Sequence, residues 1–167
     1  MFERTCVKNA TFKTSHWGSC KQQCKMLSET TKAYIAGIFD GEGTCCLALS
    51  KTTQLHHAQC YQPNVCISNT SKSLLESIRR DLWLGLVDDG RQEKEQWKRG
   101  YKLYFRQHQI VPFLALILPY LRLKKRQAEL LIEFCSLKAR GTQVTDEAIA
   151  RRRAIYNELA ELNKRGV

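Results

Sequence analysis

The sequence has no uninterrupted apolar segment long enough to span a bilayer, and this argues against a membrane-spanning helix. Its most apolar stretch, residues 110–118, contains Pro112 and is followed by Pro119, so we expect a short buried helix there. Acidic residues are also scarce: 16 Asp and Glu stand against 27 Lys and Arg, which gives a net charge of +11. This excess predicts a polyanionic partner and favours nucleic acid over a membrane surface.

The N-terminus has no apolar core of the kind found in secretory signals, so we expect an intracellular protein. An organellar, nuclear or viral-host setting stays open. Without secretion, the eight cysteines are expected to be reduced thiols. One group of residues has side chains that zinc accepts: Cys6, His16, Cys20 and Cys24. It contains only one closely spaced cysteine pair, whereas a strong zinc signature has two, so its role stays open between zinc and none.

A length of 167 residues suits one domain. Residues 1–27 carry a single acid, Glu3, and show no clear period, so we predict a basic N-terminal extension. Two roles stay open for it: contact with a nucleic-acid backbone, or a partly retained targeting segment. Residues 28–167 are then predicted to form one folded domain.

The hydrophobic pattern predicts alternating helices and strands. In chain order these are a helix at 32–41, strands at 44–51 and 60–68, a helix at 69–84, strands at 86–87 and 101–107, and helices at 110–118, 124–137 and 146–162. Pro63 predicts an edge position or a bulge for its strand, because proline cannot donate to a ladder. Asp88-Asp89-Gly90 predicts a turn. This order indicates an α+β fold.

The predicted strand at 101–107 alternates strictly between two kinds of side chain. Tyr101, Leu103 and Phe105 would form an apolar face, and Lys102, Tyr104 and Arg106 would form a cationic, hydrogen-bonding face. The sheet is therefore predicted to bury one side and to offer the other to a partner.

Two acids, Asp40 and Glu42, stand where the helix at 32–41 should end. A helix C-terminus carries partial negative charge, so each acid there should cost about 0.3–1 kcal/mol. We expect Gly41 and Gly43 to end the helix in the left-handed geometry that glycine accepts. A divalent cation would compensate for the two acids, and the alternative is an ordinary core helix with a glycine stop.

A second anomaly of opposite sign lies in Leu121–Gln127, where four cations stand at the start of a helix. The helix dipole disfavours positive charge at that end, and a phosphate would supply the missing counter-charge. The alternative is a solvated basic turn.

Residues 35–43, Ile-Ala-Gly-Ile-Phe-Asp-Gly-Glu-Gly, resemble the signature of the LAGLIDADG homing endonucleases almost position for position. The segment at 118–128 is similar to the one that supplies the active-site lysine of that family. The resemblance covers about residues 30–137 and implies an α-β-β-α-β-β-α core with a saddle-shaped antiparallel sheet and extra C-terminal helices. We find one copy of the signature, which in this family implies a homodimer through the motif helix 32–41.

On this resemblance Glu42 is a catalytic carboxylate that binds Mg²⁺ with help from the Gly41 carbonyl, and Mn²⁺ or Ca²⁺ could substitute in binding. Lys124 matches the catalytic lysine, and Lys125 or Arg126 would contact phosphate beside it. Asn69 stands where the family often has a water-organising residue, usually Gln. Asp40 is expected to be structural, capping or buttressing the interface.

The resemblance also implies DNA contacts from the sheet and its loops, because two-stranded ribbons fit the major groove. The expected DNA-binding positions are Ser50, Gln54, Gln62, Asn64, Lys72, Lys102, Tyr104, Arg106 and Lys125.

The implied function is a metal-dependent, site-specific endonuclease that cuts double-stranded DNA at a long pseudo-palindromic target, leaves 3′ overhangs and promotes intron mobility. The alternative is a non-cleaving RNA maturase or DNA-binding regulator on the same scaffold. The presence of both Glu42 and Lys124 favours cleavage.

Overall fold

The computed structural model describes residues 27–49, 61–90, 98–137 and 145–164. The elements within these ranges are α2 (Glu29–Glu42), β1 (Gly43–Leu49), β2 (Tyr61–Asn69), α3 (Lys72–Leu82), β3 (Leu86–Asp89), β4 (Tyr101–Tyr104), α4 (Gln107–Ile117), the 3-10 turn η1 (Leu118–Tyr120), α5 (Lys125–Ser136) and α6 (Asp146–Leu162). The α-β-β-α-β-β-α order with further helices is therefore confirmed.

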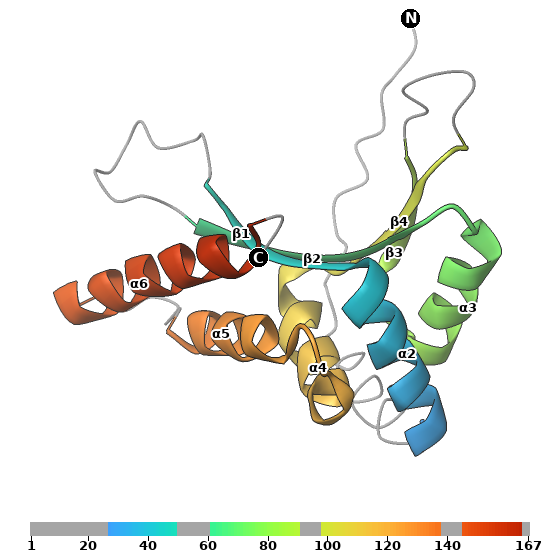
Figure 1. The fold of residues 1–167 in the computed structure, drawn as a ribbon, viewed down its shortest axis with the longest axis horizontal. Coiled ribbons are helices and arrows are strands. Elements are labelled where there is room, and N and C mark those ends of the chain that lie inside the picture. Colours follow the sequence, from blue (N-terminus) through green and yellow to red (C-terminus); the bar gives the residue numbers. More distant parts are fainter. Residues whose placement is uncertain (1–26, 50–60, 91–97, 138–144, 165–167) are drawn as a thin grey trace, which may run out of the picture.

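The four described strands form one antiparallel sheet in the order β1-β2-β4-β3. The sheet curves like a saddle, and the described helices lie on one side of it and leave the other face open (Figure 1). The predicted fold class, an α+β protein with a saddle-shaped antiparallel sheet, is confirmed.

The core lies between the inner face of the sheet and the helices beneath it. Leu47, Val65, Ile67 and Leu103 point inward from three strands and are almost fully buried. Phe113 of α4 joins the layers: its ring stacks on Phe105 at 3.8 Å between centroids and meets Phe39 of α2 edge-on at 5.4 Å. Such ring pairs contribute about 0.5–1.5 kcal/mol beyond the area that they bury, so α2 is held firmly against the sheet.

Helix α2 begins earlier than the predicted 32–41, because Ser28 caps it and accepts a hydrogen bond from the Thr31 amide at 3.1 Å. The prediction that Gly41 and Gly43 end this helix in the left-handed geometry is wrong. Gly43 has φ −77° and ψ 149°, which is extended backbone, and it leads directly into β1. A Cβ on Gly43 would collide with the Phe39 carbonyl and ring, so glycine is needed there for space.

Strand β2 lies inside the sheet, so the predicted edge position of Pro63 is wrong for the strand as a whole. Locally the prediction has a physical basis. Pro63 pairs with Leu47 of β1, whereas β4 pairs only with Cys66–Asn69. Within the described residues no second strand pairs with β2 at Pro63, so its missing N–H breaks no ladder there.

Two other local predictions need correction. Asp88 and Asp89 lie in β3, opposite Lys102 and Tyr101 of β4, and do not form a turn. Strand β4 ends at Tyr104, because Arg106 becomes the cap of α4, where Gln109 Oε1 accepts a hydrogen bond from the Arg106 amide at 3.0 Å. None of the described helices has the length and apolar character that crossing a membrane requires.

Candidate functional site

The carboxylate of Asp40, in the last turn of α2, holds the turn that precedes α5. It accepts hydrogen bonds from the backbone amides of Arg122 at 2.8 Å and Lys124 at 2.9 Å. Both oxygens are thus engaged by amides more than 80 residues away in the chain. Asp40 has a structural role here, and it ties the end of the motif helix to the basic segment.

Lys124 completes this connection from the other side, since its ammonium group donates to the backbone carbonyl of Asp40. Carbonyls in the last turn of a helix carry partial negative charge, so a cation there is favourable. The two charge anomalies therefore lie side by side and partly offset each other. We expected a metal ion to compensate for the charge of Asp40 and a phosphate to compensate for the charge of Lys124. For these two residues the expectation is wrong, because each is already engaged within the protein.

Glu42 remains uncompensated. Its side chain is exposed at the end of α2, and no hydrogen bond or ion pair engages it within the described part of the chain. The last turn of α2 contains no basic residue. A free carboxylate at the negative end of a helix, directly beside the Asp40–Lys124 contact, is the strongest electrostatic anomaly of the site.

The donor set fits one part of a cation site. Glu42 offers free carboxylate oxygens, and hard oxygen ligands suit Mg²⁺. Asp40 is less available, because each of its two oxygens already accepts a hydrogen bond from a backbone amide. The described residues contain no group of three or more His, Cys, Asp or Glu side chains that could hold a metal. A complete site would therefore need ligands from outside one described chain.

The cations that follow Lys124 differ in availability. Arg126 is held by Glu158 of α6, with 2.7 Å between nitrogen and oxygen. Lys125 is exposed and has no ion-pair partner in the described ranges. Of the two positions expected to contact phosphate, Lys125 is the one that is free to do so.

Asn69 lies at the same end of the strand pair as Glu42, because β1 begins at Gly43 and Gly43 pairs with Ile67. Its side-chain oxygen accepts a hydrogen bond from the Ser71 amide at 2.8 Å. Ser71 in turn caps α3. Asn69 therefore helps to shape the β2–α3 connection, and its predicted role in organising water stays a prediction.

Lys72 is held in an ion pair rather than left free. Its ammonium lies 2.8 Å from Asp89 of β3 and 5.6 Å from the centroid of the Tyr101 ring. The hydrogen bond between Lys72 and Asp89 raises the pKa of Lys72 and lowers the pKa of Asp89. A phosphate that binds Lys72 would have to compete with this carboxylate.

The open face of the sheet carries four of the predicted DNA-binding side chains. The pairing of Ser68 with Lys102 and of Cys66 with Tyr104 places alternate residues of β2 and β4 on one face. The exposed residues of this set are Gln62, Asn64, Lys102 and Tyr104.

Arg106 is exposed but caps α4 beyond the end of β4. Ser50 and Gln54 lie outside the described residues, as do the Cys6, His16, Cys20 and Cys24 group and residues 1–26 of the extension predicted at 1–27.

Sequence reasoning missed one feature of this face and one contact of the site. Thr44, Cys46 and Ala48 of β1 share it, since Cys46 pairs with Asn64 and Ala48 with Gln62. Their small side chains gave no signal in the sequence that this strand contributes to the open face. The hydrogen bonds from the Arg122 and Lys124 amides to Asp40 join distant parts of the chain, so no local sequence pattern indicated them.

No family model matches the chain, and no curated protein matches it by sequence. Solved structures match it strongly. The homing endonuclease I-CvuI in complex with the I-CreI target is 15% identical, with a TM-score of 0.65 over 83% of this chain and 86% of that one. The archaeal intron-encoded homing endonuclease I-Vdi141I, complexed with DNA, is 19% identical, with a TM-score of 0.67 over 83% and 87%.

A third match is to a longer protein. The LAGLIDADG homing endonuclease I-LtrWI bound to target DNA is 20% identical, with a TM-score of 0.63 over 79% of this chain and 45% of that one. At these identities the likeness concerns the fold. The expected resemblance is confirmed at that level: the described chain has the fold of the LAGLIDADG homing endonucleases.

Proposed function

We propose that this protein is a metal-dependent endonuclease that cuts double-stranded DNA at a specific site. The observation that carries the proposal is the free Glu42 carboxylate beside the Asp40–Lys124 contact, at the end of an open, polar sheet face. The solved structures with this fold support it, because the three described above are homing endonucleases in complex with DNA.

Recognition is assigned to the open face of the sheet. Gln62 and Asn64 supply amide donors and acceptors, and Lys102 and Tyr104 supply a cation and a hydroxyl. In the major groove each base pair presents a distinct donor and acceptor pattern that such groups can distinguish. The net charge of +11 would favour binding to the phosphate backbone, with an affinity that falls as salt rises.

Hydrolysis is assigned to Glu42 and Lys124. Glu42, with the Gly41 carbonyl, would hold a divalent cation such as Mg²⁺. When bound, such an ion stabilises charge on phosphoryl oxygens and lowers the pKa of water. The Lys124 ammonium, fixed at the Asp40 carbonyl, would lie beside the phosphate and stabilise the negative charge that develops in the transition state.

The exposed face of α2 supports a homodimer. Ile35, Ala36 and Phe39 face the core, whereas Gly37 and Gly41 face open space: apart from the backbone of the helix itself, no atom of the described residues lies within 4 Å of where a Cβ would be. Monomer packing therefore does not require glycine at 37 or 41. Two such helices could pack closely through these small residues.

Two further observations support a homodimer: the exposure of apolar side chains near α2 and the length of the chain relative to similar structures. Tyr34 of α2 is 57% exposed, and Leu123, next to the Asp40-held amides, is 76% exposed. The chain spans most of I-CvuI and I-Vdi141I but only 45% of I-LtrWI. A second copy of this fold would supply the other half of such a protein, and with it a second Glu42. The target would then be long and roughly palindromic.

The experiment uses DNA that spans the intron-free insertion site of the gene's own intron. Wild type and Glu42→Gln are incubated with it in Mg²⁺ and in EDTA. We expect cleavage only by wild type with Mg²⁺, with short 3′ overhangs, and unchanged binding by Glu42→Gln. Cleavage by Glu42→Gln at the wild-type rate would refute the assignment. If wild type binds but never cuts while splicing of its intron depends on it, the protein is a maturase; binding alone would indicate a regulator.

A further inference from the structure

Helix α6 is fixed beside β1, the strand at one edge of the sheet (Figure 1). The Asn163 side-chain amide donates to the backbone carbonyl of Cys45 in β1 at 3.0 Å. The Tyr156 ring packs on Tyr61 of β2, with 4.7 Å between centroids. Ile155 and Leu159 bury the side of the helix that faces the core. The opposite side of α6 is thus held in a fixed position next to the sheet.

Three consecutive arginines in α6 have different environments. Arg151 binds Glu133 of α5 through two nitrogens, at 2.6 and 2.7 Å. Arg152 donates to the Leu137 carbonyl at 3.3 Å and lies over the Phe134 ring. Because successive helical residues are about 100° apart, Arg153 turns away from α5. It is exposed and has no partner in the described ranges.

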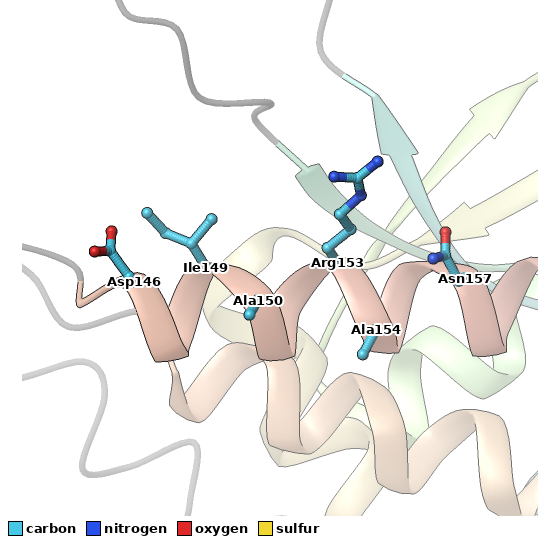
Figure 2. Close-up of a pocket in the computed structure, with 6 residues that line it drawn as sticks. All are labelled: Asp146, Ile149, Ala150, Arg153, Ala154 and Asn157. Carbon is cyan, nitrogen blue, oxygen red and sulfur yellow. The ribbon is translucent and has the colours of Figure 1, made fainter.

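Figure 2 shows where this third arginine points. The Arg153 side chain extends from α6 away from α5, on the side where β1 lies, and Asn157 stands one turn further along the same side. Asn157 is also exposed and without a partner among the described residues. Ala150 and Ala154 leave a shallow hollow beside them. Among the residues that line this hollow the acid is Asp146, which lies two turns away, in the first turn of α6, where the helix dipole favours it.

We propose that Arg153 and Asn157 bind the DNA phosphate backbone beyond the edge of the sheet, so that α6 lengthens the contacted duplex on the flank of each protomer. This inference rests on the proposed function. Arginine and asparagine are side chains that contact phosphate oxygens without reading sequence. Among the described residues Arg153 has no ion-pair partner and Asn157 has no hydrogen-bond partner. Both residues lie beside the edge strand β1, in a chain of net charge +11.

The test compares Arg153→Gln with Arg151→Gln, which removes the same charge from the same helix at a position that faces α5. Binding of each variant and of wild type to a mixed-sequence duplex is measured over a range of salt concentrations without Mg²⁺. We expect Arg153→Gln to flatten the slope of log affinity against log salt by about 0.9 for each phosphate that it no longer neutralises, and Arg151→Gln to leave the slope unchanged. Asn157→Asp should weaken binding, because it places a negative charge at the phosphate.

A series of duplexes shortened from both ends shows where along the DNA Arg153 makes its contact. The difference between wild type and Arg153→Gln should disappear once the duplex no longer reaches α6. An equal loss on the shortest duplex that still binds, or equal slopes for the two arginine variants, would overturn the inference and leave the proposed function standing. If wild type fails to bind duplex DNA at all, the proposed function itself fails. Urea unfolding of both arginine variants shows that each is folded.

Discussion

Asp40 and Lys124 contact each other twice: the Asp40 carboxylate accepts the Lys124 amide at 2.9 Å, and the Lys124 ammonium donates to the Asp40 carbonyl. This reciprocal contact joins the end of α2 to the start of α5. It means that the position of the basic segment depends on an acid whose two oxygens are both engaged by backbone amides. Asp40 and Glu42 are two residues apart and are expected to behave differently when replaced.

Asp40→Asn is expected to lower the free energy of unfolding by about 1–3 kcal/mol, because hydrogen bonds to a charged group contribute about 1.5–3 kcal/mol each and the amide can accept at only one atom. Cleavage should fall with it as the 122–124 turn loses its position. Glu42→Gln should leave stability unchanged or raise it by about 0.3–1 kcal/mol, since an acid at a helix C-terminus is unfavourable. Urea unfolding and a cleavage assay on both variants measure this. An Asp40→Asn protein of full stability would contradict the structural role.

Gly37 and Gly43 are expected to be needed for different reasons, Gly37 for contact with a second copy and Gly43 for packing within one chain. Gly37→Leu should fold normally, because a Cβ there meets open space, but it should lose the dimer, as seen by sedimentation. Gly43→Ala should lower the free energy of unfolding by about 1–3 kcal/mol, because its Cβ would collide with the Phe39 carbonyl. If Gly37→Leu sediments as wild type does, the α2 interface is wrong.

Asp89→Asn should strengthen non-specific DNA binding, because it releases Lys72 from its ion pair. Lys72→Gln should weaken binding, and Asp81→Asn serves as the control, since it removes the same charge from an exposed position on α3 without touching Lys72. Acid should mimic Asp89→Asn. The pKa of Asp89 is lowered, so its pairing with Lys72 is complete above the ordinary carboxyl pKa and is lost as pH falls through the lowered value. Equal affinities for Asp89→Asn and Asp81→Asn would argue against competition at Lys72.

Cys45 should make the protein less stable in alkali. Burial raises the pKa of its thiol from 9.0 to about 12. Between these values the unfolded chain loses a proton that the folded protein keeps, so stability falls as pH rises through this window. The slope for one proton is about 1.4 kcal/mol per pH unit. Urea unfolding of wild type and Cys45→Ala above pH 9 compares the slopes, and Cys45→Ala should be shallower by up to that amount. Parallel slopes would mean that the thiol titrates normally.

The sequence predicted what short-range patterns encode. The helix at 32–41 and the alternation of Tyr101–Tyr104 are local, and each appears in the structure with shifts at the ends. The ladder around Pro63 and the pairing of Asp88 and Asp89 depend on strands elsewhere in the chain, and no local pattern reports them. The site shows the same division. Glu42 was identifiable because it breaks a local rule, whereas the hold of Asp40 on Arg122 and Lys124 spans more than 80 residues and appears only in the fold.

The cover that α6 gives to β1 also bears on solubility. An edge strand presents unpaired backbone groups on which another chain can add a strand. The hydrogen bond from Asn163 occupies the carbonyl of Cys45, and the helix itself stands beside the strand. A chain truncated before residue 145 would keep the described strands but expose the edge of β1. We expect such a chain to aggregate by adding strands at this edge. The C-terminal helix thus keeps the outermost strand from recruiting neighbouring chains.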